Sequence, residues 1–253
     1  MHFELAEEHR MLAELVQRFV ADHLMPLETA VLAREAAGEN PELTAGERAA
    51  LDAVSRDMGL WSLDAPAELG GHDLPHVALV AVNEALGGTV AKYVLPPDSP
   101  NLRMLAASVN DAQRDAYLAP YARGETVSAI GISEPGAGAD PSGMTTRAVR
   151  ADDGSDDWII NGQKVWTTGA HFSDYGIVIT RTDPTQPKHK GLTMFWMDMK
   201  SPGVTVKPIK QANGQSEFNE VYFVDVKIPD SQRLGKVGDG WNVSLTTLMN
   251  ERM

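Results

Sequence analysis

Residues 130–143 read Ile-Gly-Ile-Ser-Glu-Pro-Gly-Ala-Gly-Ala-Asp-Pro-Ser-Gly, the most informative run in this chain. Gly136, Gly138 and Gly143 stand beside hydroxyl groups and prolines, which predicts a tight loop with accessible backbone N–H groups. Such groups can approach a phosphate closely. Taken alone, the run also fits a strand followed by an ordinary surface turn, because Gly and Pro cluster at many turns.

A second short motif follows at residues 164–170, Lys-Val-Trp-Thr-Thr-Gly-Ala. Trp166 stands two positions before Thr168, and in an extended segment these two side chains share a face. Taken singly, a Trp in a strand is most often a core residue. Together, however, the two motifs could hold a diphosphate at one end and a planar redox ring at the other.

Four further motifs are distributed along nearly the whole chain. With the first two, and in this order, they resemble the landmarks of the acyl-CoA dehydrogenase family. One Gly-rich loop would be weak evidence, whereas six motifs in series are strong evidence. The four read Pro-Ala-Glu-Leu-Gly-Gly at 66–71, Pro-Lys-His-Lys-Gly-Leu at 187–192, Phe-Asn-Glu-Val at 218–221 and Gly-Asp-Gly-Trp at 238–241.

The resemblance implies a flavoprotein oxidoreductase of fatty acid metabolism that carries FAD. The implied reaction is α,β-dehydrogenation of an acyl-CoA thioester: a carboxylate removes the α-proton, and the β-hydrogen leaves as hydride to flavin N5. The implied partners are the acyl-CoA substrate and electron-transfer flavoprotein or a similar acceptor. Members of the family are usually dimers or tetramers, and for this chain the oligomeric state is left open.

By position, the resemblance assigns the first motif to the cofactor and the substrate. The backbone of Ile130 and Ile132 and the hydroxyl of Ser133 would meet the flavin ring. Gly138 and Ala139 would approach the FAD diphosphate and the substrate. Ala139 departs from the family pattern, which usually has Ser or Thr there, so a hydroxyl donor is lost and these contacts are weaker by about 1 kcal/mol for one hydrogen bond.

The resemblance assigns the second motif, Trp166, Thr167 and Thr168, to the flavin. The indole would pack near the isoalloxazine, where a bulky ring excludes water and restricts access of oxygen. The Thr168 hydroxyl would hydrogen-bond near N5. A donor at N5 stabilises the charge that develops as hydride arrives.

The catalytic base is sought at the end of the chain. Most family members carry it in the final domain, but a subset places a Glu in the first helix of that domain, immediately before an Arg. Glu251-Arg252 matches that arrangement. The resemblance therefore makes Glu251 the base, with its pKa tuned by desolvation, and Arg252 a contact to the CoA moiety. Without the resemblance, a solvated helical ion pair is the better interpretation.

Composition bounds the class of protein. The chain has 253 residues, of which 43% are hydrophobic and 23% charged, as in ordinary globular proteins. It has no Cys, which excludes disulfides, thiol catalysis and Cys-based zinc sites. The acidic start lacks the features of a secretion signal, and no apolar run is long enough to span a membrane, so a cytoplasmic location is the default expectation. His72 and His76 lack a third ligand at suitable spacing, so no metal site is predicted.

The net charge of −13 is unevenly distributed. Residues 1–120 hold 19 acidic and 8 basic side chains, whereas residues 121–253 hold 16 and 14. A nucleic-acid binder would show a basic footprint, and none is present. Any diphosphate must then be met by backbone amides and a few local cations, such as those of Lys188-His189-Lys190, a loop that equally fits a mobile solvated hairpin tip.

The first 120 residues predict helices. Apolar residues recur at helical spacing between Leu5 and Met25, and Pro26 ends or kinks that helix. Residues 28–46 predict a loop or a broken helix. A capping box at Thr44 to Glu47 precedes a helix that Gly59 stops, His76 to Leu86 form another, and residues 102–119 form one or two more with a break near Asn110.

Short β-branched or aromatic runs follow Pro120, which predicts an antiparallel β-barrel or two packed sheets. Asn161-Gly162 is read as a hairpin turn. The expected fold class is α+β: an N-terminal α-helical domain over 1–120, a β middle domain binding flavin and acyl-CoA over 121–234, and from 235–253 the first helix of a truncated C-terminal helical bundle. The expected strands are residues 127–132, 145–150, 158–160, 164–168, 176–181, 192–197, 204–209 and 220–226.

Two other functions remain open. The scaffold could serve a related flavin oxidase or monooxygenase, which oxygen consumption and peroxide release would reveal. It could also be a non-catalytic subunit, or one that completes an active site with a partner. The colour of the purified chain separates these, because a bound yellow flavin bleached by an acyl-CoA contradicts a non-catalytic role.

Overall fold

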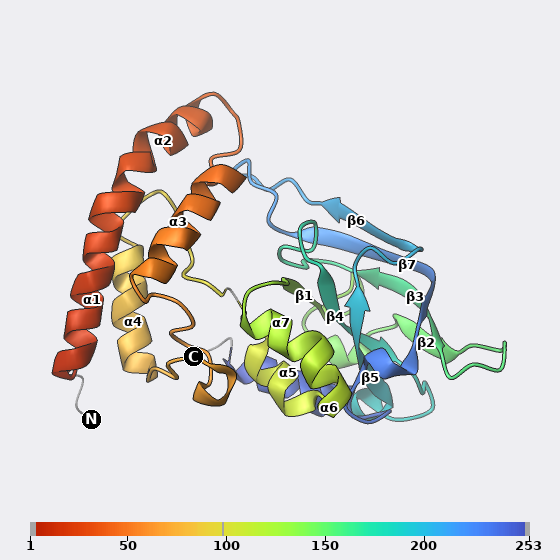
Figure 1. Ribbon diagram of the computed structural model, residues 1–253. Helices are drawn as coiled ribbons and strands as arrows, with labels where there is room; N and C mark the ends of the chain where they lie inside the picture. Colours follow the sequence, from red (N-terminus) through yellow and green to blue (C-terminus); the bar gives the residue numbers. More distant parts are fainter. Residues whose placement is uncertain (1–3, 98, 251–253) are drawn as a thin grey trace. The chain divides into compact units, whose positions relative to one another are not determined.

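The computed structural model describes residues 4–97 and 99–250, the last five of these by their backbone alone. They group into two compact units that divide between residues 98 and 99 (Figure 1). The first unit is helical, and the second combines helices with one sheet, so the predicted α+β class is confirmed.

The first unit begins with α1 (Glu7–Phe19), which runs through a π-helical turn (Val20–Leu24) and a 3-10 turn (Met25–Leu27) into α2 (Glu28–Ala36). The interruption predicted at Pro26 thus takes the form of these two turns, after which the helix resumes. The proline lies at the start of the 3-10 segment, where the hydrogen-bond pattern of the helical path changes because proline has no N–H to donate to the preceding turn.

Helices α3 (Ala45–Asp57) and α4 (His76–Leu86) complete the first unit. The predicted capping box is confirmed: the Glu47 N–H donates to Thr44 Oγ1 at 3.3 Å, and the Thr44 N–H donates to Glu47 Oε2 at 2.7 Å. Gly59 follows α3 with φ +74°, as a helix stop requires. The apolar faces of these helices share one core, which includes Val16, Phe19, Leu24, Val31, Leu51, Leu60, Val82 and Tyr93.

The second unit opens with α5 (Leu102–Ser108), α6 (Asp111–Gln113), a π-helical turn (Arg114–Leu118) and α7 (Ala119–Ala122). The predicted break near Asn110 is confirmed, and Asn110 caps α6. The Gln113 amide donates to the carbonyls of Ser231 and Arg233 at 2.7 and 2.8 Å. These helices therefore belong to the sheet unit by their contacts, although the sequence groups them with the N-terminal helices.

The sheet has eight strands within the described residues, in the order β6-β7-β3-β2-β4-β5-β8, and β1 pairs with β4 beside this path. Its core includes Trp158, Ile160, Phe195, Val221, Phe223 and Val226. The strands are β1 (Ser128–Gly131), β2 (Arg147–Arg150), β3 (Trp158–Lys164), β4 (Tyr175–Arg181), β5 (Leu192–Asp198), β6 (Val204–Pro208), β7 (Asn219–Ile228) and β8 (Arg233–Leu234).

The sheet is mixed and open, which corrects the expectation of an antiparallel barrel. β1 runs parallel to β4 from Ser128↔Tyr175 to Gly131↔Val178, and β2 meets β4 in the same sense. Among the described strands, β6 and β8 end the path without pairing with each other. The sequence could not show this, because strand direction depends on crossover connections rather than on local turn residues.

Asn161-Gly162 is not a hairpin turn, and that prediction is wrong. Both residues lie inside β3, where the register with β7 shifts between Ile160 and Gly162. Gly162 adopts φ +151°, and a Cβ there would meet Thr146 Cα at 2.6 Å. The glycine thus serves a β-bulge and a close approach of β2, which are its other common uses in strands.

The described chain ends in α8 (Gly240–Asn250), a helix within the predicted range 235–253. The Asn242 amide donates to the Asp239 carboxylate at 2.6 Å and helps to fix this start. Among the described helices, none combines the length and apolar character that a membrane crossing demands.

Candidate functional site

The two sequence motifs lie side by side where β1 and β3 end. β1 ends at Gly131 and β3 at Lys164, and the Val165 N–H then donates to the Ser133 carbonyl at 2.9 Å. Segments that are far apart in the chain therefore leave the sheet together. This juxtaposition is the starting point of the candidate site.

A buried ion pair lies beneath the junction of the two motifs. Lys164 is fully buried and Glu134 is 4% exposed, and Lys164 Nζ lies 2.9 Å from Glu134 Oε1. Lys164 Nζ also donates to the Ile132 carbonyl at 3.0 Å. Glu134 Oε1 accepts from the Thr146 N–H at 2.9 Å, and Oε2 accepts from the Thr145 N–H at 2.6 Å and from its hydroxyl. Both charges are therefore satisfied by several partners, as burial requires.

The environment keeps this pair ionised at neutral pH. Burial alone would raise the pKa of Glu134, but the Lys164 charge and the hydrogen bonds from Lys164, Thr145 and Thr146 lower it to about 2. Burial lowers the pKa of Lys164 to about 8, against the opposing effect of Glu134. At pH 7 the loop therefore carries no net charge from these two residues.

Beyond Glu134 the first motif folds into a loop of consecutive turns. The Glu134 and Ala137 backbones hydrogen-bond each other at 3.0 and 3.3 Å, and Asp140 accepts from the Ser142 N–H at 3.2 Å. Gly138 and Ala139, between these turns, are exposed, and their N–H groups have no hydrogen-bond partner within the described part of the chain. The loop thus presents free backbone donors to solvent, as an anion site needs.

The tip of this loop is tied to the basic segment 188–190. Lys188 Nζ lies 2.5 Å from the Asp140 carboxylate, and Arg181 donates to the carbonyls of Ser142 and Lys188. Hydrogen bonds from Lys188 and Ser142 lower the pKa of Asp140 to about 2. His189 lies against Trp241 with ring centroids 4.4 Å apart. The segment 188–190 is therefore anchored, rather than the free hairpin tip that the sequence also allowed.

The second motif is not a strand, which corrects the expectation for residues 164–168. β3 ends at Lys164, and Trp166 has φ +60°, which breaks the alternation of an extended chain. The argument that Trp166 and Thr168 share a strand face therefore fails. Both side chains are nevertheless exposed, Trp166 by 58%, and its indole meets Phe218 edge-on at 5.9 Å.

Thr167 is turned away from the other predicted cofactor contacts. Its N–H donates to the Asn219 carbonyl at 3.0 Å, and its carbonyl accepts from Asn219 Nδ2 at 2.9 Å. Its side chain is 3% exposed, and its hydroxyl has no hydrogen-bond partner among the described residues. The paired backbone groups of Thr167 anchor the segment, and its role toward a cofactor stays a prediction.

The remaining predicted residues fall into two groups. Ile130 lies in β1 opposite Ile177, and the Ile132 carbonyl accepts a hydrogen bond from Lys164. Both residues are half-buried and precede Ser133 in the chain. Glu251 and Arg252 lie outside the described residues. Of the described residues of the predicted site, Ser133, Gly138, Ala139, Trp166 and Thr168 lie on two adjoining segments beyond the strand ends.

The sequence reading missed three residues that build this arrangement: Glu134, Lys164 and Asn219. Asn219 Nδ2 donates to the carbonyls of Thr167 and Glu217, and Asn219 Oδ1 lies 3.1 Å from His171 Nδ1. All three stand within the quoted motifs. No local signal marked Lys164 as buried, because it follows the polar run Asn161-Gly162-Gln163 at the end of β3.

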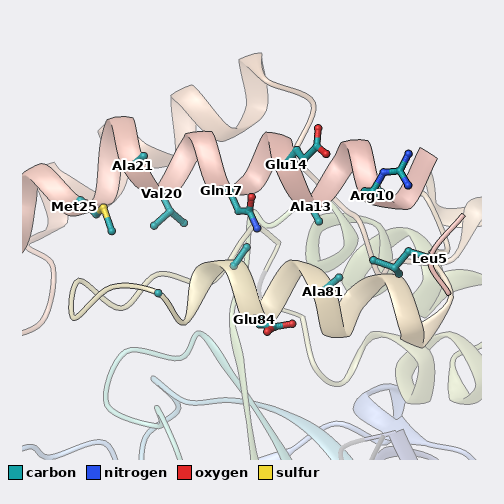
Figure 2. Close-up of a pocket in the computed structure, with 12 residues that line it drawn as sticks. Leu5, Arg10, Ala13, Glu14, Gln17, Val20, Ala21, Met25, Ala81 and Glu84 are labelled. Carbon is teal, nitrogen blue, oxygen red and sulfur yellow. The ribbon is translucent and has the colours of Figure 1, made fainter. Parts of the chain in front are cut away.

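A separate groove lies in the first unit between α1 and α4 (Figure 2). Its volume is about 630 Å³. Small residues line its middle, Leu5 and Met25 lie toward its ends, and Glu14 and Glu84 contribute charge. None of the predicted site residues that the structure describes lines this groove. Within the described chain, no cluster of three or more His, Asp or Glu is arranged to hold a metal ion.

Comparison with known proteins identifies the class of protein that this fold and site define. The acyl-CoA dehydrogenase N-terminal domain matches residues 6–125, and the acyl-CoA dehydrogenase middle domain matches residues 129–226. The chain therefore belongs to the acyl-CoA dehydrogenase family, and its relatives are oxidoreductases.

Two curated relatives share between a third and two fifths of their aligned residues with this chain. Acyl-CoA dehydrogenase FadE34 of Mycobacterium tuberculosis is 38% identical over 87% of this chain and 31% of its own length. (R)-benzylsuccinyl-CoA dehydrogenase of Thauera aromatica is 36% identical over 95% of this chain and 61% of its own. Among solved structures, the Tcur3481-Tcur3483 steroid ACAD superposes with a TM-score of 0.80 at 27% identity, covering all of this chain and 63% of that one. The chain thus spans less than two thirds of the length of each.

Proposed function

We propose that this chain serves the FAD-dependent α,β-dehydrogenation of an acyl-CoA thioester. One observation carries the proposal: the loop 132–143 and the segment 165–168 leave the sheet side by side, held by the hydrogen bond from Val165 to Ser133. On adjoining segments they carry the hydroxyls of half-buried Ser133 and exposed Thr168, the exposed Trp166 indole and two free backbone donors. Membership of the acyl-CoA dehydrogenase family supports the same reaction.

The donor set fits FAD. A diphosphate needs N–H donors that are free of internal partners, and Gly138 and Ala139 offer such donors in the described chain. A flavin ring needs an apolar surface and hydroxyl groups near its edge. Exposed Trp166 and Thr168 and half-buried Ser133 offer these groups on the two segments. Thr167 remains a proposed contact, with its backbone paired to Asn219 and its buried hydroxyl without a partner among the described residues.

Each residue then has a definite task. Ser133 and Thr168 would hydrogen-bond the edge of the ring, and Trp166 would shield its surface from water. Gly138 and Ala139 would bind the diphosphate and approach the thioester substrate through their backbone. When bound, FAD supplies the hydride acceptor at N5. A donor that is fixed before the reaction stabilises developing charge without further reorganisation.

The reaction also needs a base for the α-proton. Glu251 is our proposal for this group and Arg252 for a contact to CoA, both on the sequence pattern alone. A carboxylate that desolvation brings closer to neutral pKa is suited to the task. A Glu251→Gln variant of near-normal turnover would remove Glu251 from the mechanism.

A second candidate function is a subunit whose active site is completed by a partner chain. The Tcur3481-Tcur3483 steroid ACAD, by its name, joins two proteins. The whole of this chain superposes on 63% of that one. We propose electron-transfer flavoprotein or a similar carrier as the acceptor in either case. Steroid and aromatic acyl groups enter the substrate panel because of the names of the relatives.

The test begins with the colour of the purified chain and the visible spectrum of added FAD. Anaerobic addition of straight-chain, aromatic and steroid acyl-CoA thioesters should bleach a bound flavin, and a dye acceptor should restore it. Thr168→Val should weaken FAD binding by about 2–10-fold for one lost hydrogen bond. Thr205→Val, at an exposed position on β6, is the matched control and should not change it.

Three results are informative in other directions. A chain that binds no FAD would contradict the proposal. A flavin that no thioester bleaches unless a second protein is added would favour the partner-completed subunit. Rapid reoxidation by oxygen with release of peroxide would instead identify a flavin oxidase or monooxygenase.

A further inference from the structure

The ion pair between Lys164 and Glu134 reaches every segment of the proposed cofactor site. Lys164 is at the end of β3, Glu134 follows β1, and the carboxylate binds the backbone of Thr145 and Thr146 just before β2. Glu134 therefore closes the loop 134–145 at its base. Without it, the two ends of the loop would lose the contacts that hold them together.

Ser133 lies between the two residues that this pair holds. The Ile132 carbonyl on one side accepts from Lys164 at 3.0 Å, and the Glu134 carboxylate on the other accepts at 2.9 Å. The Ser133 carbonyl is itself bound by the Val165 N–H. The backbone on both sides of Ser133 is thus fixed, and with it the direction in which its hydroxyl projects.

The surroundings are shaped to admit the lysine. A Cβ on Gly131 would lie 3.2 Å from Lys164 Cγ, so a glycine at the end of β1 leaves room for the lysine stem. Lys164 Nζ also lies 3.5 Å from the sulfur of buried Met144. Hydrophobic residues in place of the pair would fill this space without burying two charges. A protein with such a replacement is often as stable as the parent or more stable.

We propose that Lys164 and Glu134 are positioning residues for the cofactor: their ion pair fixes the loop 132–146 so that Ser133, Gly138 and Ala139 meet FAD. The inference rests on the proposed function. The pair could contribute to global stability, to the order of the loop, or to both. A pair that contributed to stability alone would leave the affinity for FAD unchanged. Substituting either partner should therefore change the local order of the loop and the affinity for FAD together.

The variants are Lys164→Met, Glu134→Gln and their combination. The single variants leave one buried charge unpaired and should lower the thermal midpoint. The double variant removes both charges and should recover much of that midpoint. It should not recover the loop, because a thioether and an uncharged amide cannot together hold the Ile132 carbonyl and the N–H groups of both threonines.

The first measurement is amide hydrogen exchange of the chain without cofactor. We expect exchange in residues 132–146 to be at least tenfold faster in the Lys164→Met and double variants, with β4 and β5 unchanged. The second measurement is the dissociation constant for FAD, which we expect to rise at least tenfold in both variants. Val226→Ala, in the core between β7 and β3, is the control: it should lower the thermal midpoint with less than a twofold change in FAD affinity.

The outcomes are distinct. Uniformly faster exchange across the sheet unit, or FAD affinity within twofold of the parent chain in the double variant, would overturn the positioning role. If Lys164→Met does not fold, the double variant carries both measurements. If the parent chain binds no FAD, the proposed function fails, and the exchange measurement still decides whether the pair orders the loop.

Discussion

Replacing Gly162 by Ala tests the account of β3 as a bulged strand. The added Cβ would meet Thr146 Oγ1, Cα and Cβ at 2.5, 2.6 and 2.7 Å. Two of these three atoms cannot rotate away, so β2 and β3 would have to separate. The backbone at Gly162 also has φ +151°, a value that residues other than glycine rarely adopt.

The expected loss of stability follows from these two effects. Forcing one methyl into a filled space costs about 1–3 kcal/mol, and a non-glycine residue at such a φ costs about 1–3 kcal/mol. The sum is about 2–6 kcal/mol, a large share of the roughly 5–15 kcal/mol that stabilises a typical domain. Urea unfolding followed by the fluorescence of Trp158 and Trp196, both buried in the sheet unit, measures it.

Two other glycines separate the contributions. Gly154 has φ +83° but open space around a Cβ, so Gly154→Ala should show the backbone effect alone, about 1 kcal/mol. Gly136 has open space and no positive φ, so Gly136→Ala should be nearly neutral. A Gly162→Ala variant no less stable than Gly154→Ala would refute the close approach of β2 to β3.

Three further predictions concern the site and the first unit. Ala139→Ser restores a hydroxyl on the exposed loop and should tighten FAD or acyl-CoA binding by about 2–10-fold, for one hydrogen bond; titration calorimetry that shows weaker binding would contradict it. Because the pKa of Glu134 is lowered to about 2, its contribution to stability is full above about pH 4.5 and is lost as the pH falls through 2. About 2 kcal/mol of it should be gone at pH 3, so the urea midpoint should fall more steeply between pH 7 and 3 in the parent chain than in Glu134→Gln. Thr44→Ala removes the cap of α3 and should lower stability by about 1 kcal/mol, whereas an unchanged thermal midpoint would show that Glu47 caps the helix alone.

The helical part of the fold was predictable because its signals are local. Thr44 and Glu47 mark the start of α3, Gly59 marks its end, and His76 to Leu86 match α4 as predicted. Each signal depends on residues within one or two turns of helix. The continuation from α1 into α2 was less clear, because whether a proline ends or merely distorts a helix depends on packing around it.

The sheet shows where local signals fail. Asn161-Gly162 is a strong hairpin signal, yet the glycine is used for a bulge and for a close approach of Thr146, which precedes β2. Trp166 looks like a strand residue, yet it has φ +60° because the chain turns away after Lys164. Both errors involve contacts between segments distant in the sequence, Gly162 with Thr146 and Val165 with Ser133.

The candidate site was predicted in its segments but not in its construction. Ser133, Gly138, Ala139, Trp166 and Thr168 lie on the two adjoining segments as the motifs indicated. The sequence did not show that Thr167 is turned inward and held by Asn219. Nor did it show that Lys164 and Glu134 form the support, because a charged residue in a motif says nothing of whether it is buried until its partner is placed.

The open sheet leaves β6 as an outer strand, and its sequence shows how such a strand avoids recruiting other chains. An unpaired strand edge can template intermolecular pairing and so initiate aggregation. Val204 and Val206 pack on the core, while Thr205 and Lys207 alternate with them on the exposed side. Pro208 then ends the strand without an N–H to offer, and Lys207 Nζ lies 5.1 Å from the centre of the Tyr222 ring. Substituting Lys207 and Pro208 by Val would leave an apolar strand edge that can pair with strands of neighbouring molecules.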